Sequence, residues 1–179
     1  MKHSLAAFLI LCSSSLAAVE FENMSISLYA DTLAKGFKAY REGNHERAFA
    51  LLSLTARWGE KDAQRLLGAM YLAGEGTKVD LVEGTAWLML AAESGRKIDR
   101  DTFKRAREAV PEQVLDAADQ IYAEYLPVYG KSATGISCKR ARRGDRGRKE
   151  VVCERPRGIN DQRFKVPVVD AAFYYAIGD

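Results

Sequence analysis

The stretch from Ala63 to Gly95 constrains the fold most, because it combines two amphipathic helical patterns with a glycine-bearing turn between them. In each pattern, apolar residues recur at three- and four-residue spacing, so they share one face of a helix. Gly68 would let a neighbouring helix come close, and Gly74 and Gly76 supply positions where a positive φ is cheap, which turns the chain. Two helices alone cannot bury both apolar stripes. The pattern therefore predicts a neighbouring unit of the same kind.

A second copy of the pattern lies upstream, between Lys35 and Gly59. Small and large apolar residues of its second helix precede their counterparts in the downstream helix by a constant offset of about 36 residues. The matching residues are Ala48, Leu51, Leu52, Ala56 and Gly59 against Gly84, Trp87, Leu88, Ala92 and Gly95. A period of this length with helix–turn–helix content predicts a mainly α fold, namely a short α-solenoid of stacked helical hairpins.

The residues that carry this repeat resemble the Sel1-like repeat, a relative of the tetratricopeptide helical hairpin. The resemblance rests on Leu67–Gly68, Met70–Tyr71, Gly74, Gly76, Asp80, Ala86–Trp87, Ala91–Ala92 and Gly95. Two residues depart from the family pattern: Gly84 stands where a helix-favouring residue is usual, and Thr77 where an apolar residue often follows the turn. The resemblance covers residues 35–95. It implies a TPR-like architecture and a role in protein–protein contact, and it implies no chemistry.

Residues 1–17 are predicted to be a signal peptide. Lys2 and His3 give a positive start, Leu5 to Leu11 form a compact apolar run, and Ala17 ends a small-residue cleavage site. The run is too short for a permanent span, which needs about 20 residues, so no transmembrane segment is expected in the mature chain. A buried N-terminal helix is an alternative, and lipidation at Cys12 stays open. We expect the protein to be periplasmic or secreted.

Export changes the interpretation of the cysteines. Removal of the signal peptide leaves Cys138 and Cys153, an even number in an oxidising compartment. Each lies in a short β-prone run, so we expect a disulfide across a β-hairpin, worth about 3 kcal/mol in the loop-entropy model. A metal site would need further His or Cys ligands nearby, and His45 is far upstream. No metal or cofactor is therefore expected.

The remaining chain divides by composition. Helices are predicted at 31–42, 45–58, 61–73, 81–94 and 112–126. The charged segment at 96–107 could hold a further helix capped by Asp99 or Asp101. Past Gly95 the repeat pattern fails, and the helix ended by Pro127 and Gly130 is expected to close the stack. From residue 131 onward short β patterns follow, including a strand around Phe164 to Val168. The apolar run at 171–177 is expected to pack on the helices or, alternatively, to bind a partner.

We therefore expect a signal peptide at 1–17, a helical repeat domain with closing helices at 18–130, and a basic β/loop region at 131–179. Its most unusual feature is an arginine-rich loop inside the expected disulfide. This loop carries Lys139, Arg140, Arg142, Arg143, Arg146, Arg148 and Lys149. Guanidinium groups held on a stapled loop can bind an anionic envelope component such as a phosphate-bearing lipid or polymer. A solvated charged loop is the alternative. No nucleic acid is expected, because no aromatic residue is interleaved for base stacking.

A catalytic function is disfavoured by the residues themselves. The mature chain has one histidine, and neither a Gly-x-Ser-x-Gly elbow nor a His-Glu-x-x-His zinc pair occurs. Carboxylate pairs such as Asp99 with Asp101 lie in charged helical segments, where capping or solvation explains them.

The leading hypothesis is therefore a non-catalytic adaptor that binds a protein partner on the surface of its helical repeats. We expect that surface to include Lys38, Arg41, Arg65 and Tyr71. This hypothesis requires the two helical hairpins to nest along one apolar seam lined by Leu52, Tyr71 and Leu88.

Overall fold

The computed structural model describes residues 21–142, 147, 149–155 and 163–167. The helices are α1 (Ile26–Arg41), α2 (His45–Arg57), α3 (Lys61–Ala73), α4 (Leu81–Ala92), α5 (Lys97–Ala109) and α6 (Glu112–Tyr129). The strands are β1 (Phe21–Ser25), β2 (Ser137–Arg142), β3 (Lys149–Glu154) and β4 (Arg163–Pro167). The predicted signal peptide and the apolar run at 171–177 lie outside the described residues.

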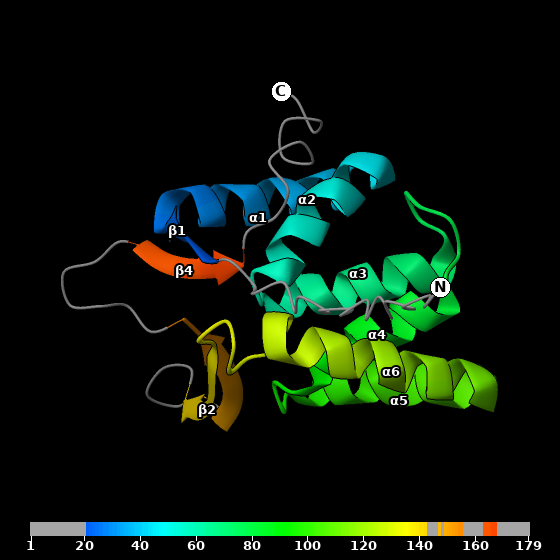
Figure 1. The fold of residues 1–179 in the computed structure, drawn as a ribbon. Helices are drawn as coiled ribbons and strands as arrows, with labels where there is room; N and C mark the ends of the chain where they lie inside the picture. Colours follow the sequence, from blue (N-terminus) through cyan, green and yellow to red (C-terminus); the bar gives the residue numbers. More distant parts are fainter. Residues whose placement is uncertain (1–20, 143–146, 148, 156–162, 168–179) are drawn as a thin grey trace, which may run out of the picture.

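The first four helices form two consecutive pairs, and the last two helices both pack on α4 (Figure 1). Helix α1 packs on α2 and α3 packs on α4, while α2 also packs on α3 and joins the first two pairs. Helix α4 in turn packs against both α5 and α6, so the stack continues past Gly95. The predicted helix at 112–126 is present as α6, and together with α5 it covers α4 at the end of the two repeat units.

The predicted apolar seam between the first two pairs is confirmed for Leu52 and Tyr71. Leu52 is fully buried in the shared core and Tyr71 is half-buried against it, whereas Leu88 is fully buried against Gly68 of α3, outside this cluster. Met70 of α3 and Trp87 of α4 also belong to this core. The two repeat units therefore nest side by side and share one interior, as an α-solenoid requires.

Two glycines set the close crossing of α3 and α4. A Cβ atom added at Gly68 would lie 2.7 Å from the Gly84 carbonyl oxygen and 2.8 Å from Leu88 Cγ. One added at Gly84 would lie 2.8 Å from Leu72 Cγ and 2.9 Å from the Gly68 carbonyl oxygen. The residue that departs from the family pattern, Gly84, is therefore the counterpart of Gly68 at a backbone-to-backbone contact.

The turn between α3 and α4 fits against the first helical pair. Gly74 ends α3 with φ +71°, and the Asp80 carboxylate begins α4 by accepting the Val82 and Glu83 N–H groups at 3.0 and 2.9 Å. Within the turn, a Cβ atom at Gly76 would lie 2.1 Å from the carbonyl oxygen of His45. The turn glycine is therefore needed for close packing as well as for its positive φ.

Two helices extend further than predicted. Helix α1 begins at Ile26, because the Ser25 hydroxyl caps it by accepting the Leu28 N–H at 3.2 Å. Helix α6 runs through Pro127 to Tyr129, where the Tyr129 ring stacks on Trp87 at 5.6 Å. Tertiary packing at its last turn thus outweighs the hydrogen bond that proline cannot donate.

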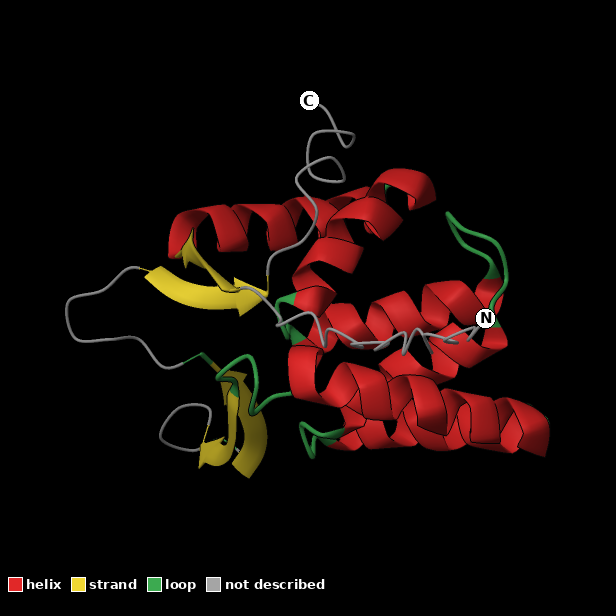
Figure 2. Cartoon of the chain, viewed as in Figure 1, coloured by secondary structure: helices red, strands yellow, loops and turns green. Residues whose placement is uncertain are grey.

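The strands form two separate antiparallel pairs (Figure 2). Strands β2 and β3 make the predicted hairpin, and the predicted Cys138–Cys153 disulfide joins directly opposed residues of it. The strand predicted around Phe164 is present as β4, and it pairs with β1 from the start of the described chain. The sequence had no signal for β1, so this pairing was not predicted.

The crossing of α3 and α4 predicts that Gly84→Ala destabilises the protein. Alanine favours a helix by about 1 kcal/mol over glycine, but the added methyl group would overlap Leu72 and the Gly68 carbonyl. We expect the free energy of unfolding to fall by about 1–3 kcal/mol in urea denaturation. Gln120→Ala, on the exposed face of α6, is the control and should change it by about 0.5 kcal/mol or less. A stabilising Gly84→Ala would contradict the close contact.

Candidate partner-binding surfaces

A row of aromatic rings crosses the helical repeats. It consists of Phe49 on α2, Tyr71 on α3, Trp87 on α4, and Tyr125 and Tyr129 on α6, and we call it the aromatic row. The rings of Phe49 and Tyr71 meet edge-on with centroids 5.1 Å apart, and Trp87 lies 5.1 Å from Tyr125. Trp87 is buried, whereas the other four rings are half-buried and keep part of their surface in solvent. Aromatic rings in this state are the side chains that most often anchor protein interfaces.

Glu83 lies beside the aromatic row and is bound by one of its tyrosines. The Tyr125 hydroxyl donates to both Glu83 carboxylate oxygens, at 2.9 and 3.1 Å. Burial raises the pKa of Tyr71 above its ordinary value and the Glu83 charge raises it further. The same two causes, in the same order, raise the pKa of Tyr125. Both phenols therefore stay protonated, and the row presents hydroxyl groups beside one carboxylate.

The predicted basic residues of α1 lie at its exposed end. Lys38 and Arg41 occupy its last turn, one on each side of Tyr40 in the sequence. The Lys38 ammonium lies 3.8 Å from the Glu42 carboxylate, and 67% of its side chain is exposed. The Tyr40 hydroxyl donates to Glu75 at 2.8 Å and so ties this end of α1 to the turn after α3. Lys38 and Arg41 are therefore exposed to solvent, and Phe49 lies in the second turn of α2.

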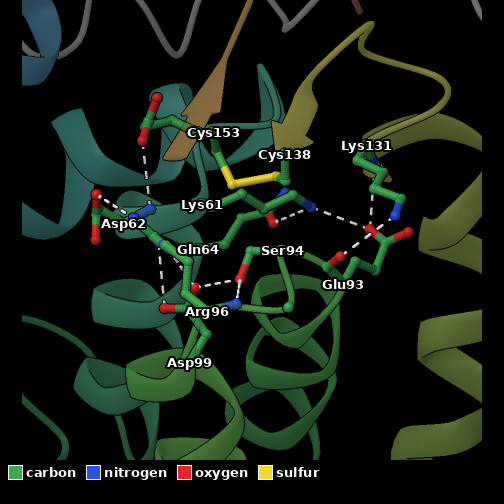
Figure 3. Close-up of a disulfide and its surroundings, with 12 residues drawn as sticks. Lys61, Asp62, Gln64, Glu93, Ser94, Arg96, Asp99, Lys131, Cys138 and Cys153 are labelled. Carbon is green, nitrogen blue, oxygen red and sulfur yellow. Dashed lines mark hydrogen bonds and ion pairs between the residues drawn. A yellow bond between two sulfur atoms is a disulfide. The ribbon is translucent and has the colours of Figure 1, made fainter. Parts of the chain in front are cut away.

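Arg65 lies elsewhere, in a cluster of ion pairs between α3 and α5. Figure 3 shows Asp62, Arg96 and Asp99 of this cluster. Its guanidinium contacts Asp62 at 3.1 Å and the fully buried Asp99 carboxylate at 3.1 Å. Arg96 bridges the same two carboxylates, at 2.9 Å from Asp62 and 2.6 Å from Asp99. Ser94 also donates to Asp99. Arg65 thus has a structural role, and Asp99, expected as a capping or solvated residue, is the buried acceptor of the cluster.

A second polar cluster lies deeper, around a buried lysine. The Lys61 side chain has no exposed surface, and its ammonium donates to Gln64 Oε1 at 2.9 Å, to the Leu90 carbonyl at 2.9 Å and to Glu93 at 3.0 Å. Gln64 donates onward to the carbonyls of Ala56 and Tyr129. Glu93 accepts the Lys131 N–H at 3.1 Å. Figure 3 shows these side chains converging. We call Lys61, Gln64 and Glu93 the buried polar cluster.

The hairpin carries the described part of the predicted anion-binding set. Arg140 and Arg142 are exposed on β2, and Lys149 is exposed on β3. Arg143, Arg146 and Arg148 lie outside the described residues. Directly after β3, Arg155 reaches the helical body, where its guanidinium donates to the carbonyls of Trp58 and Thr134. It also lies 5.4 Å from the Tyr29 ring centroid.

Sequence reasoning missed several of these residues. Phe49 falls beside the apolar stripe of its helix, so a large aromatic residue off the stripe was the available signal. No signal in the sequence pointed to Arg155 or to the buried polar cluster, because a lysine near the start of a helix or an arginine after a strand normally lies in solvent.

Metal sites and membrane-spanning helices are both absent from the part of the chain that the structure describes. It holds no group of three His, Cys, Asp or Glu side chains arranged to bind a metal ion. None of its helices is both long and apolar enough to cross a membrane.

Comparison with known proteins identifies the fold. No protein-family model matches the sequence. No curated protein matches it. Among solved structures, the chain is similar to c5321, a protective antigen present in uropathogenic Escherichia coli strains that displays an SLR, or Sel1-like repeat, fold. The TM-score is 0.53 and the sequence identity 21%, over 59% of this chain and 24% of that protein. The chain thus spans about a quarter of the relative's length. The likeness shows the fold, which confirms the architecture that the sequence resemblance implied.

The buried polar cluster predicts a large effect of Lys61→Met. Methionine keeps the length of the side chain but leaves Glu93 and the Leu90 carbonyl without their shared donor. We expect the free energy of unfolding to fall by about 3 kcal/mol in urea denaturation. Lys97→Met is the matched control, because Lys97 also pairs with a carboxylate but has 83% of its side chain exposed. It should cost about 0.5 kcal/mol or less. Equal losses in the two variants would show that burial of Lys61 is not structurally important.

The ion-pair cluster predicts a pH-dependent effect of Asp62→Asn. Burial opposes ionisation of Asp62, but hydrogen bonds from Arg96 and then Arg65 outweigh it and lower its pKa below 3.8. A carboxyl group whose pKa is lowered by folding stabilises the folded state at every pH above its unfolded-state pKa. This stabilisation is lost as the pH falls through the folded-state pKa.

We therefore expect Asp62→Asn to lower the melting temperature at pH 7, with a loss of about 1 kcal/mol or less because Asp62 is partly exposed. The difference from the wild type should shrink as the pH falls below 3.8. Thermal unfolding followed by circular dichroism measures both effects. A difference that grew in acid would mean that the cluster does not hold Asp62 ionised.

Proposed function

We propose that the protein is a non-catalytic adaptor, exported to the periplasm or secreted, that binds a segment of a protein partner along the aromatic row. The observation that carries the proposal is the Phe49–Tyr71 ring pair, which is half-buried at the junction of the two repeat units. The SLR fold is consistent with it, because stacked helical hairpins create an extended surface to which neighbouring repeats all contribute.

The aromatic row has the properties of an anchoring site. Its rings are fixed by contacts to one another and by the Tyr125–Glu83 hydrogen bonds, so a partner would order few side chains on binding. Apolar side chains of a partner would cover the exposed ring surface. The hydroxyl groups and the Glu83 carboxylate would then give orientation and specificity.

Lys38 and Arg41 extend this surface at the end of α1. Both are exposed, and Phe49 follows them after one turn. They would attract an acidic flank of the bound segment and speed association more than they would strengthen it. Arg65 takes no part, because its ion pairs with Asp62 and Asp99 already engage it.

Two features support the location and the lack of catalysis. The Cys138–Cys153 disulfide belongs to the class of bonds that persist outside the reducing cytosol. The predicted signal peptide adds to this, although it lies outside the described residues. The sequence carries no catalytic motif around its one mature histidine, His45, which packs against the ring of Tyr40.

The test is partner capture followed by direct binding. The full chain, carrying an affinity tag and a crosslinker, is exposed to an envelope extract, and the recovered protein is then purified and titrated calorimetrically. We expect Tyr71→Ala to weaken binding by about 2 kcal/mol, as truncation of an anchoring aromatic residue does. Lys38→Glu should reduce the association rate in a salt-dependent way.

Lys104→Glu is a matched control for Lys38→Glu. Lys104 on α5 is also exposed and also pairs with a glutamate one turn on, at the same 3.8 Å. It should leave binding unchanged. If Lys104→Glu weakens binding as much as Lys38→Glu, or if Tyr71→Ala has no effect on any recovered partner, the proposed surface is wrong.

A further inference from the structure

The β2–β3 hairpin separates its charges between two faces. Opposed residues in an antiparallel pair project to the same side, and sides alternate along each strand. The register therefore places one set of residues with the disulfide, and we call this side the disulfide face. It carries Cys138, Arg140, Arg142, Lys149, Val151 and Cys153. The opposite face carries Lys139 together with Glu150, Val152 and Glu154.

The disulfide face is basic and holds its charges close together. Arg142 lies directly opposite Lys149, and Arg140 is two residues further along the same side, about 7 Å away along the strand. All three side chains are exposed. The two described glutamates of the hairpin lie on the other face, so the described strands supply no acidic side chain here. Like charges directly opposed across two strands are destabilising.

One covalent restraint and one set of hydrogen bonds hold this unfavourable arrangement in place. The disulfide joins the strands next to the basic residues, and Arg155 fixes the end of β3 to the carbonyls of Trp58 and Thr134. A two-stranded hairpin alone would be marginal in water. The chain thus keeps a repulsive cluster of three cations on a rigid, exposed ribbon, where an anionic ligand would relieve the repulsion.

The shape of the hairpin indicates which kind of anion it can bind. Figures 1 and 2 show it as a narrow two-stranded ribbon set to one side of the helices. Such a ribbon offers a face rather than an enclosing pocket, so it cannot surround a small free anion as ligand pockets do. It can touch several phosphate groups at once if they lie in a surface. Guanidinium forks suit phosphate oxygens, and the neighbouring Val151 can approach the interfacial region.

We infer that the disulfide face binds the phosphate groups of anionic lipid headgroups at a membrane surface. Arg140, Arg142 and Lys149 supply the contacts. This is a second binding site, separate from the aromatic row, and it would hold the adaptor at the membrane while the helical surface binds its partner. Basic residues near an anionic bilayer strengthen binding by about five-fold each.

The experiment is co-sedimentation of the full chain with vesicles of phosphatidylcholine containing phosphatidylglycerol. We expect binding that weakens steeply between about 0.1 M and about 1 M salt, where the screening length falls from about 10 Å to about 3 Å. The variant Arg140→Ser, Arg142→Ser, Lys149→Ser should bind about 100-fold more weakly. Vesicles of phosphatidylcholine alone carry no net charge, so the hairpin should not bind them. With these vesicles the triple variant and the wild type should co-sediment to the same extent.

Lys139→Ser is the matched control for Arg140→Ser. Both remove one cation from adjacent residues of β2, but Lys139 projects to the opposite face. We expect Arg140→Ser to weaken binding about five-fold and Lys139→Ser less than about two-fold, because its charge is turned away and screened. All variants share residues 1–20, so any affinity of that segment cancels. Equal effects of the two substitutions would overturn the inference, since net charge alone would explain them.

Three further measurements test whether charge, an intact disulfide and a membrane surface are each needed for binding. Arg140→Lys with Arg142→Lys keeps the charge and should keep most of the binding. Thiol titration verifies that each variant retains its disulfide. Inorganic pyrophosphate is added as a competitor: if it displaces the protein at phosphate concentrations equal to those of the vesicles, the ligand is a free phosphate and the membrane assignment is wrong. No sedimentation with the anionic vesicles would also refute it.

Discussion

The fold depends on one buried ammonium group. Lys61 has no exposed surface, yet its three hydrogen bonds reach two further side chains and a helix carbonyl. Through Gln64 the cluster extends to the end of α6, and through Glu93 to Lys131 at the start of the C-terminal region. Apolar packing along the seam supplies most of the burial but is not directional. The buried polar cluster is directional, so it fixes how the second helical pair, the end of α6 and the start of the C-terminal region meet.

The repeat architecture could be predicted because helical periodicity is a local property. The spacing of apolar residues and the turn glycines located four helices of the first two pairs, and the cysteines located the hairpin. The same periodicity located α6, whereas α5 and β1 could not be predicted in this way. Helix α5 is mostly exposed and buries little besides Asp99 and Ala106, while β1 is defined by its pairing with distant β4. Both are determined by tertiary contacts that leave no periodic pattern in the sequence.

On the candidate surfaces too, local features could be predicted and tertiary contacts could not. Tyr71 and the basic residues of α1 were identified as surface residues, because side-chain type and helical face sufficed. Arg65 was assigned to that surface too, but its partner Asp99 lies in another helix and is fully buried. A charge on a helix looks the same in sequence whether it meets solvent or a buried carboxylate. On the hairpin, sequence indicated a basic loop, whereas only the register showed that Arg140 and Lys139 lie on different faces.

The pairing of β1 with β4 has a consequence for the order of folding. These strands are the first and the last elements of the described chain. During synthesis from the N-terminus, β1 must wait until every helix and the hairpin have emerged before it meets its neighbour. Closing so large a loop loses entropy before the contact compensates for it. The helical pairs, whose contacts are local, can assemble earlier, and the strand pair then joins the two ends of a body that has already formed.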